Sequence, residues 1–207
     1  MQLSRRQALQ TAAACSAITT FNSLTLAHEE PNMVDPSPFG FCFNTSTVRG
    51  QKLSLDQQVD LVIKAGYDGI EPWIRDIQAY QDRGGSLDDL RKKLADANVK
   101  VVSAIGFAHW IVDDQDERTK GLETAKHDMA LVKKLGGTHI AAPPVGAVEI
   151  ENFNLFHAAE RYHALCEVGR NGGVIPQLEL WGFSKTLSRL GELAFVATEC
   201  GHPDACV

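Results

Sequence analysis

The sequence predicts an α/β protein with a parallel sheet, organised as part of an eight-stranded (β/α)8 barrel. Five segments with strand character are each followed by a segment with helical periodicity, and a sixth strand begins at the end of the chain. Polar residues recur where these strands end. An open doubly wound sheet is the alternative. It typically carries a Gly-x-Gly-x-x-Gly turn after its first strand, and residues 43–47 contain no glycine, which favours the barrel.

The elements follow one another at a regular spacing. Strands are expected to start near residues 39, 69, 99, 138, 174 and 205. The expected strands cover residues 39–44, 70–73, 99–107, 139–142, 174–182 and 205–207, and the helices cover 55–65, 87–97, 116–135, 153–168 and 185–200. Ser54, Ser86 and Ser184 are the predicted helix N-caps. Five strand–helix units plus the start of strand six make about two thirds of a barrel, so we expect a C-terminally truncated fragment.

Charge and composition narrow the class of protein. The 207 residues carry 20 Lys and Arg against 26 Asp and Glu, a net charge of -6, without a basic cluster. Nucleic acid is therefore not an expected partner. No apolar run approaches the roughly 20 residues that span a bilayer. The oligomeric state is left open.

The first residues differ in character from the rest. Paired arginines at Arg5 and Arg6 precede an alanine-rich apolar run, and small residues at 25–27 suit a signal peptidase. This resembles a twin-arginine export signal over residues 1–27, which predicts a periplasmic protein, with a linker at 28–38 and the barrel at 39–207. A disordered basic terminus, an amphipathic cap helix or a lipid attached to Cys15 are the alternatives. Without the signal the protein would be cytoplasmic.

Glu179 is the principal candidate for chemistry. It stands near the end of the fifth strand, where alternation places it on one face with Gln177 and Trp181. A carboxylate among apolar neighbours is costly to bury without a cation or donors, so Glu179 is predicted to bind a metal ion or transfer a proton. A rim carboxylate in one salt bridge is the simpler alternative.

Other strand ends carry side chains that would bind a substrate. Glu71 and Trp73 follow the second strand and share a face, as Glu179 and Trp181 do on the fifth. His109 follows the third strand. Two Glu-x-Trp pairs indicate a pocket with aromatic walls, suited to a sugar ring, although each Trp alone also fits a role in the core and His109 a structural role.

The cysteines predict no further site. A twin-arginine substrate folds before export in a reducing compartment, so the four cysteines after residue 27 are expected to be small buried residues and not disulfides. The Cys200-Gly-His-x3-Cys206 segment lacks the paired spacing of a zinc site.

Three segments resemble the sugar phosphate isomerase/epimerase family, the xylose isomerase-like TIM barrels. They are Ala65-Gly66-Tyr67-Asp68-Gly69-Ile70-Glu71, Phe107-Ala108-His109-Trp110 and Gln177-Leu178-Glu179-Leu180-Trp181-Gly182. The resemblance implies a divalent metal, Mn, Mg, Co or Zn, held by Glu, Asp, His and Glu at the ends of strands five to eight. Glu179 matches the first ligand, and the other three would lie beyond Val207.

The implied function is proton transfer next to the carbonyl of a sugar or sugar-like molecule. Within the family, the strand-five and strand-eight glutamates of the epimerases exchange that proton and a metal ion holds the enediolate charge. One carboxylate does not hold a catalytic ion, so the 207 residues are expected to be inactive by themselves. An exported carbohydrate-binding barrel without chemistry is the alternative. A barrel endonuclease or zinc hydrolase would need more histidines at the strand ends.

Overall fold

The computed structural model describes residues 39–207. The predicted signal, the linker and Cys15 lie outside the described residues and stay predictions. Among residues 39–207, the helices are all too short or too polar to cross a membrane.

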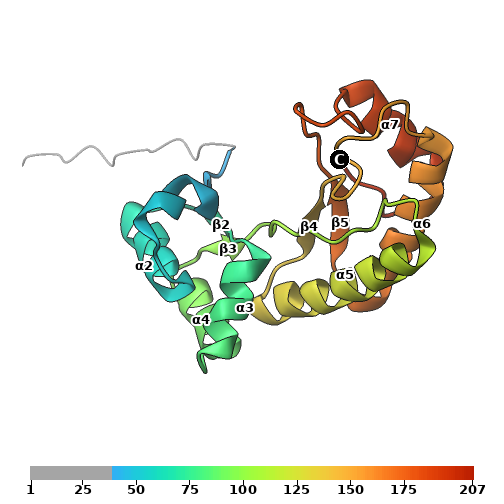
Figure 1. Cartoon of the computed structure of the whole chain (residues 1–207). Coiled ribbons are helices and arrows are strands. Elements are labelled where there is room, and N and C mark those ends of the chain that lie inside the picture. Colours follow the sequence, from blue (N-terminus) through green and yellow to red (C-terminus); the bar gives the residue numbers. More distant parts are fainter. Residues whose placement is uncertain (1–38) are drawn as a thin grey trace, which may run out of the picture. The chain divides into compact units, whose positions relative to one another are not determined.

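The described residues form strands and helices in alternation (Figure 1). The strands are β1 (Cys42–Asn44), β2 (Gly69–Glu71), β3 (Lys100–Val101), β4 (His139–Ala142) and β5 (Ile175–Leu178). The helices are the 3-10 helix η1 (Thr45–Gln51), α2 (Leu55–Ala65), α3 (Ile74–Asp82), α4 (Leu87–Asp96), α5 (Gln115–Leu135), α6 (Leu155–Gly172) and α7 (Leu190–Glu199).

The strands pair in parallel and in chain order. β2 lies between β1 and β3, with Cys42 opposite Gly69 and Ile70 opposite Val101. β4 pairs with β5 over four residues. Ile105 connects the two sheets, because it pairs with Trp73 after β2 and with Ala141 in β4. Gln177 pairs with Cys206, where a sixth strand was predicted. In a barrel, each parallel strand lies next to the strand that follows it in the chain, whereas the order reverses in a doubly wound sheet. The observed order has no reversal, so the predicted partial (β/α)8 architecture is confirmed.

Helix caps form where the sequence predicted the first helices. Ser54 and Gln57 make a reciprocal capping box at the start of α2, and the side chain of Ser86 accepts the N–H of Asp89 at the start of α4. Gly66 and Gly173 end α2 and α6 in the left-handed conformation, which glycine adopts without steric cost.

Three boundaries differ from the sequence prediction. Residues 74–82 form a helix, α3, where a loop was expected. The third strand is short, and only Ile105 extends its pairing toward residue 107. The last helix begins at Leu190 and not after Ser184. The Ser184 hydroxyl accepts the N–H of Thr186 in a turn and donates to the Val148 carbonyl, which ties this segment to the loop after β4. Cys166 and Cys200 are buried as predicted, but Cys206 is only half-buried and Cys42 is exposed.

Helices α5 and α6 lie side by side (Figure 1). The side chain of Tyr162 on α6 is buried and joins two strands. The Tyr162 hydroxyl oxygen lies 2.8 Å from the Pro176 carbonyl and 2.9 Å from the Cys206 carbonyl, and it accepts the N–H of Cys206 at 2.9 Å. This hydroxyl therefore fixes β5, which leads into Glu179, against the sixth strand.

Replacing this hydroxyl tests its role. Tyr162→Phe leaves buried backbone groups without their partner, so we expect the free energy of unfolding to fall by about 1–3 kcal/mol. Urea unfolding followed by circular dichroism measures the change. Tyr80→Phe is the control, because the half-buried Tyr80 hydroxyl has no hydrogen bond within residues 39–207. Equal stability of the two variants would contradict the assignment.

Candidate active site

Glu71 is held by a neighbouring strand. It ends β2, directly opposite Asn44 at the end of β1. The Asn44 Nδ2 donates to Glu71 Oε2 at 2.6 Å, and the Asn44 Oδ1 accepts the N–H of Ser46 at the start of η1. The strand register therefore sets the orientation of the first predicted site carboxylate.

Glu179 follows the last residue of β5 and is half-buried. Its Oε2 atom is shielded from solvent and has no hydrogen-bond partner among the described residues. Burial raises the pKa of the Glu179 carboxyl, and the negative charge of Glu71 raises it further, while a hydrogen bond from Trp181 opposes both. The charge of Glu71 thus acts on Glu179 at the carboxyl edge of the strands, the edge at which parallel barrels place their active sites.

Aromatic rings form a row beside the two carboxylates. The ring centroids of Trp73 and Phe107 are 5.1 Å apart, those of Phe107 and Trp181 6.3 Å, and those of Trp181 and Phe183 5.0 Å. Such spacings are those of interacting aromatic pairs. The two predicted tryptophans therefore belong to one aromatic wall.

Phe107 and Phe183 were not identified from the sequence. Phe107 ends the predicted third strand as Trp73 ends the second, so the strand-end rule that selected Trp73 also applied to it. Phe183 follows Trp181 by two residues, and only the loop conformation reveals that the rings stack, with an interplanar angle of 29°.

Trp73, the first ring of this aromatic wall, also carries an unpaired hydrogen-bond donor. The Nε1 of Trp73 is buried and has no acceptor within residues 39–207. The Arg75 guanidinium lies 4.3 Å from the Trp73 ring centroid, on its face. An unpaired indole N–H and an unpaired carboxylate oxygen are groups that a hydroxylated ligand satisfies.

His109 has a different partner. Its Nδ1 lies 2.6 Å from Glu117 Oε1, near the start of α5, and both side chains are close to half exposed. The ring also lies beside Gly146, where an added Cβ would contact it at 3.3 Å. The structure therefore attaches His109 to α5 and the loop after β4. Its predicted contact with substrate stays a prediction.

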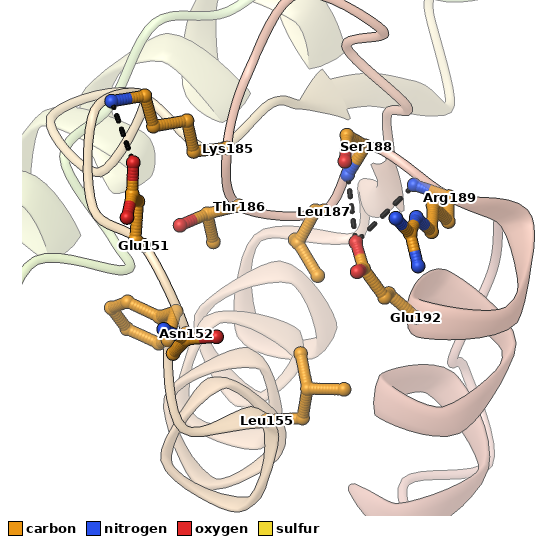
Figure 2. Close-up of a pocket in the computed structure, with 10 residues that line it drawn as sticks. Glu151, Asn152, Leu155, Lys185, Thr186, Leu187, Ser188, Arg189 and Glu192 are labelled. Atoms are coloured by element: carbon orange, nitrogen blue, oxygen red, sulfur yellow. Dashed lines mark hydrogen bonds and ion pairs between the residues drawn. The ribbon is translucent and has the colours of Figure 1, made fainter.

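A pocket of about 330 Å³ lies between the loop after β4 and the loop after β5 (Figure 2). Lys185 pairs with Glu151 across it, and Glu192 accepts the backbone N–H groups of Ser188 and Arg189. Its lining holds two acidic and two basic side chains. The formal charges cancel, so the pocket has no net charge that would attract an anion.

The described residues do not complete a metal site. A divalent catalytic ion needs about three protein ligands. No group of three or more His, Cys, Asp or Glu side chains within residues 39–207 is placed to hold one, and at His202 the Nε2 pairs with Glu167 at 3.1 Å. The unpaired Oε2 atom of Glu179 could bind a metal ion, but it belongs to no group of three or more metal ligands among residues 39–207. The residues of this part of the chain therefore do not form a metal site by themselves.

These features define a parallel α/β barrel with a carboxylate and aromatic site at the strand ends. Residues 59–206 match the xylose isomerase-like TIM barrel family, to which the chain therefore belongs. A comparison with curated proteins found no match.

Solved structures share the fold. The IolI protein with a bound zinc atom has a TM-score of 0.70 and 20% identity, over 79% of this chain and 60% of that one. A probable 3-DHS dehydratase, AsbF from Bacillus anthracis, has a TM-score of 0.68 and 16% identity, over 80% and 61%. D-psicose 3-epimerase, crystallised in the presence of D-fructose, has a TM-score of 0.65 and 17% identity, over 80% and 61%. The chain thus spans about three fifths of their length.

Neutralising Glu179 tests its environment. A carboxyl whose pKa is higher in the folded than in the unfolded state destabilises the fold once the pH exceeds its ordinary value of about 4.5. We therefore expect Glu179→Gln to be more stable than the unaltered protein at pH 7. As the pH falls through the raised pKa toward 4.5, the unaltered carboxyl becomes protonated and the difference should disappear.

Urea unfolding at a series of pH values measures this difference. Glu123→Gln is the control, because the Glu123 side chain is 73% exposed on α5 and its one ion pair within residues 39–207 is a loose pair with Lys126 at 3.9 Å. A Glu179→Gln variant that is less stable than the unaltered protein at pH 7 would contradict this prediction. It would show that hydrogen bonds or positive charges in the folded protein stabilise the Glu179 carboxylate.

Proposed function

We propose that residues 39–207 form the substrate-binding face and one proton-transferring carboxylate of a sugar isomerase or epimerase. The observation that carries the proposal is the Glu179 carboxylate, half-buried, with a raised pKa and one unpaired oxygen beside an aromatic wall. Family membership and neighbours such as D-psicose 3-epimerase support the same class of reaction.

The aromatic wall suits a sugar. The carbon-bound hydrogens of a sugar ring present an apolar face that packs on an aromatic ring, while its hydroxyls need polar partners. The Trp73 Nε1 and Glu179 Oε2 atoms supply an unpaired donor and an unpaired acceptor close to that wall. A substrate hydroxyl satisfies both kinds of group.

A raised pKa suits Glu179 for accepting a proton from carbon. The carboxylate takes the proton from the carbon next to the substrate carbonyl, and the electron pair of the broken C–H bond forms an enediolate with the charge on oxygen. A second acid on the opposite face, outside the residues described, returns a proton to the same carbon in an epimerisation, whereas in an isomerisation Glu179 gives its proton to the former carbonyl carbon. Burial, and to a smaller extent the nearby charge of Glu71, raises the Glu179 pKa, which makes Glu179 a stronger base.

Non-catalytic carbohydrate binding is the second candidate. The aromatic row favours this candidate, because four rings that can bind a sugar stand beside only two carboxylates, Glu71 and Glu179, among the described residues. In that case the wall binds sugar and Glu179 only accepts a hydrogen bond from it.

Exchange with solvent deuterium distinguishes the two functions. Eight strands close such a barrel, and the described residues supply five strands and one further pair, so the assay uses a protein in which the barrel is complete. NMR in D2O would follow exchange next to the carbonyl of D-fructose, D-psicose and L-ribulose. We expect Glu179→Gln to slow exchange at least about 100-fold, the scale of a lost general base, and Glu123→Gln to leave it unchanged. Sugar binding without exchange would support the second candidate.

A further inference from the structure

We infer that Trp181 and Phe183 form a stacking subsite for a second ring, so that the preferred ligand is a glycoside and not a free monosaccharide. A glycoside here means a sugar joined through its anomeric carbon to another sugar or to an aromatic group. Because that carbon is then no longer a carbonyl, proton transfer to Glu179 acts next to a ketone at another carbon of the first sugar. The inference rests on the proposed function, because it places the first sugar beside Glu179 and Trp73.

The aromatic row runs from a half-buried ring to an exposed one. Its inner member, Trp73, is half-buried and keeps an unpaired buried N–H. Its outer member, Phe183, is 73% exposed and stacks on Trp181 through one face only. Three steps of 5.0 to 6.3 Å between centroids separate these two rings along the row. Four rings in contact offer more aromatic surface than a single sugar ring can cover.

The outer rings are held in place before any ligand arrives. The N–H of Ser184 donates to the Trp181 carbonyl at 2.9 Å, and the N–H of Lys185 donates to the Val148 carbonyl at 2.7 Å. The Thr186 hydroxyl donates to the Ile150 carbonyl at 2.9 Å. The loop that carries Phe183 is thus fastened along the loop after β4. A loop fixed in advance loses little freedom on binding, which favours a direct binding role.

The charges around this loop indicate an uncharged partner. Lys185, two residues after Phe183, pairs with Glu149 at 3.5 Å and with Glu151 at 3.1 Å, the latter shown in Figure 2. Two carboxylates therefore neutralise the positive charge of Lys185, so this side chain is not available to bind a phosphate. The exposed face of Phe183 fits an uncharged ring, such as the apolar face of a sugar or a phenyl group.

Matched glycosides test the inference on the 207-residue chain. Methyl and phenyl glycosides of D-glucose, D-galactose, D-mannose and D-xylose form pairs that differ only in the second ring, and calorimetry measures their dissociation constants. For each sugar that binds, we expect the phenyl glycoside to bind about fivefold more tightly, within the range of one aromatic contact. Phe183→Ala should remove this preference and leave the methyl glycoside affinity within about twofold.

Phe156→Ala is the matched control, because Phe156 is an exposed phenylalanine at the start of α6 that stacks edge-on with Phe195, outside the aromatic row. It should keep the phenyl preference. Circular dichroism confirms that both variants fold.

Three results would overturn the inference. Equal affinity for the methyl and phenyl members of every pair would do so while leaving the proposed function intact. A self-association of the chain that Phe183→Ala abolishes in sedimentation would show that the ring contacts a second copy instead. Failure of all eight glycosides, and of the free sugars, to bind would contradict both this inference and the proposed sugar site.

Discussion

The account depends on one carboxylate that the fold holds in a half-buried position with an oxygen left unpaired. Removing a charged group from water is unfavourable unless donors or a counter-charge replace the water, and Glu179 has a hydrogen bond from Trp181 but a second negative charge nearby in Glu71. Such an arrangement lowers stability, and proteins retain it mainly where the group is used in binding or chemistry. The raised pKa of Glu179 is a direct consequence of that placement.

The parallel barrel brings these groups together. Strands that run in the same direction end at the same edge, so residues distant in sequence meet there. Asn44 and Glu71 are adjacent because β1 and β2 pair in register, and Glu179 reaches the same edge through β5. Tyr162 fixes the position of β5 from the helix side, which connects the packing of α6 to the position of the carboxylate.

The sequence predicts well where local interactions decide the structure. Ser54 and Gly66 bound α2 as expected, because an N-cap hydroxyl and a left-handed glycine act within a few residues. The strand at His139–Ala142 was also predicted with its observed ends. The carboxyl-edge position of Glu71 and Glu179 followed from the same alternation of strands and helices.

Tertiary interactions explain the failures. Ser184 has the local pattern of a helix cap, but its hydroxyl bonds to a distant loop, and Leu187 is fully buried with a positive φ of 53°. The helix after Trp73 lacks a side-chain cap, so no local signal marked its start. The stacking of Phe183 on Trp181 and the pairing of His109 with Glu117 depend on loop conformations that periodicity does not encode.

The pKa of Glu179 itself tests the central claim most directly. Carbon-13 NMR of the side-chain carboxyl, assigned by comparison with Glu179→Gln, would follow its titration in the unaltered protein and in Glu71→Gln. We predict a pKa above the ordinary value of about 4.5 that falls when the Glu71 charge is removed but stays raised because burial is the larger cause. A Glu179 pKa at or below the ordinary value in the unaltered protein would contradict the account.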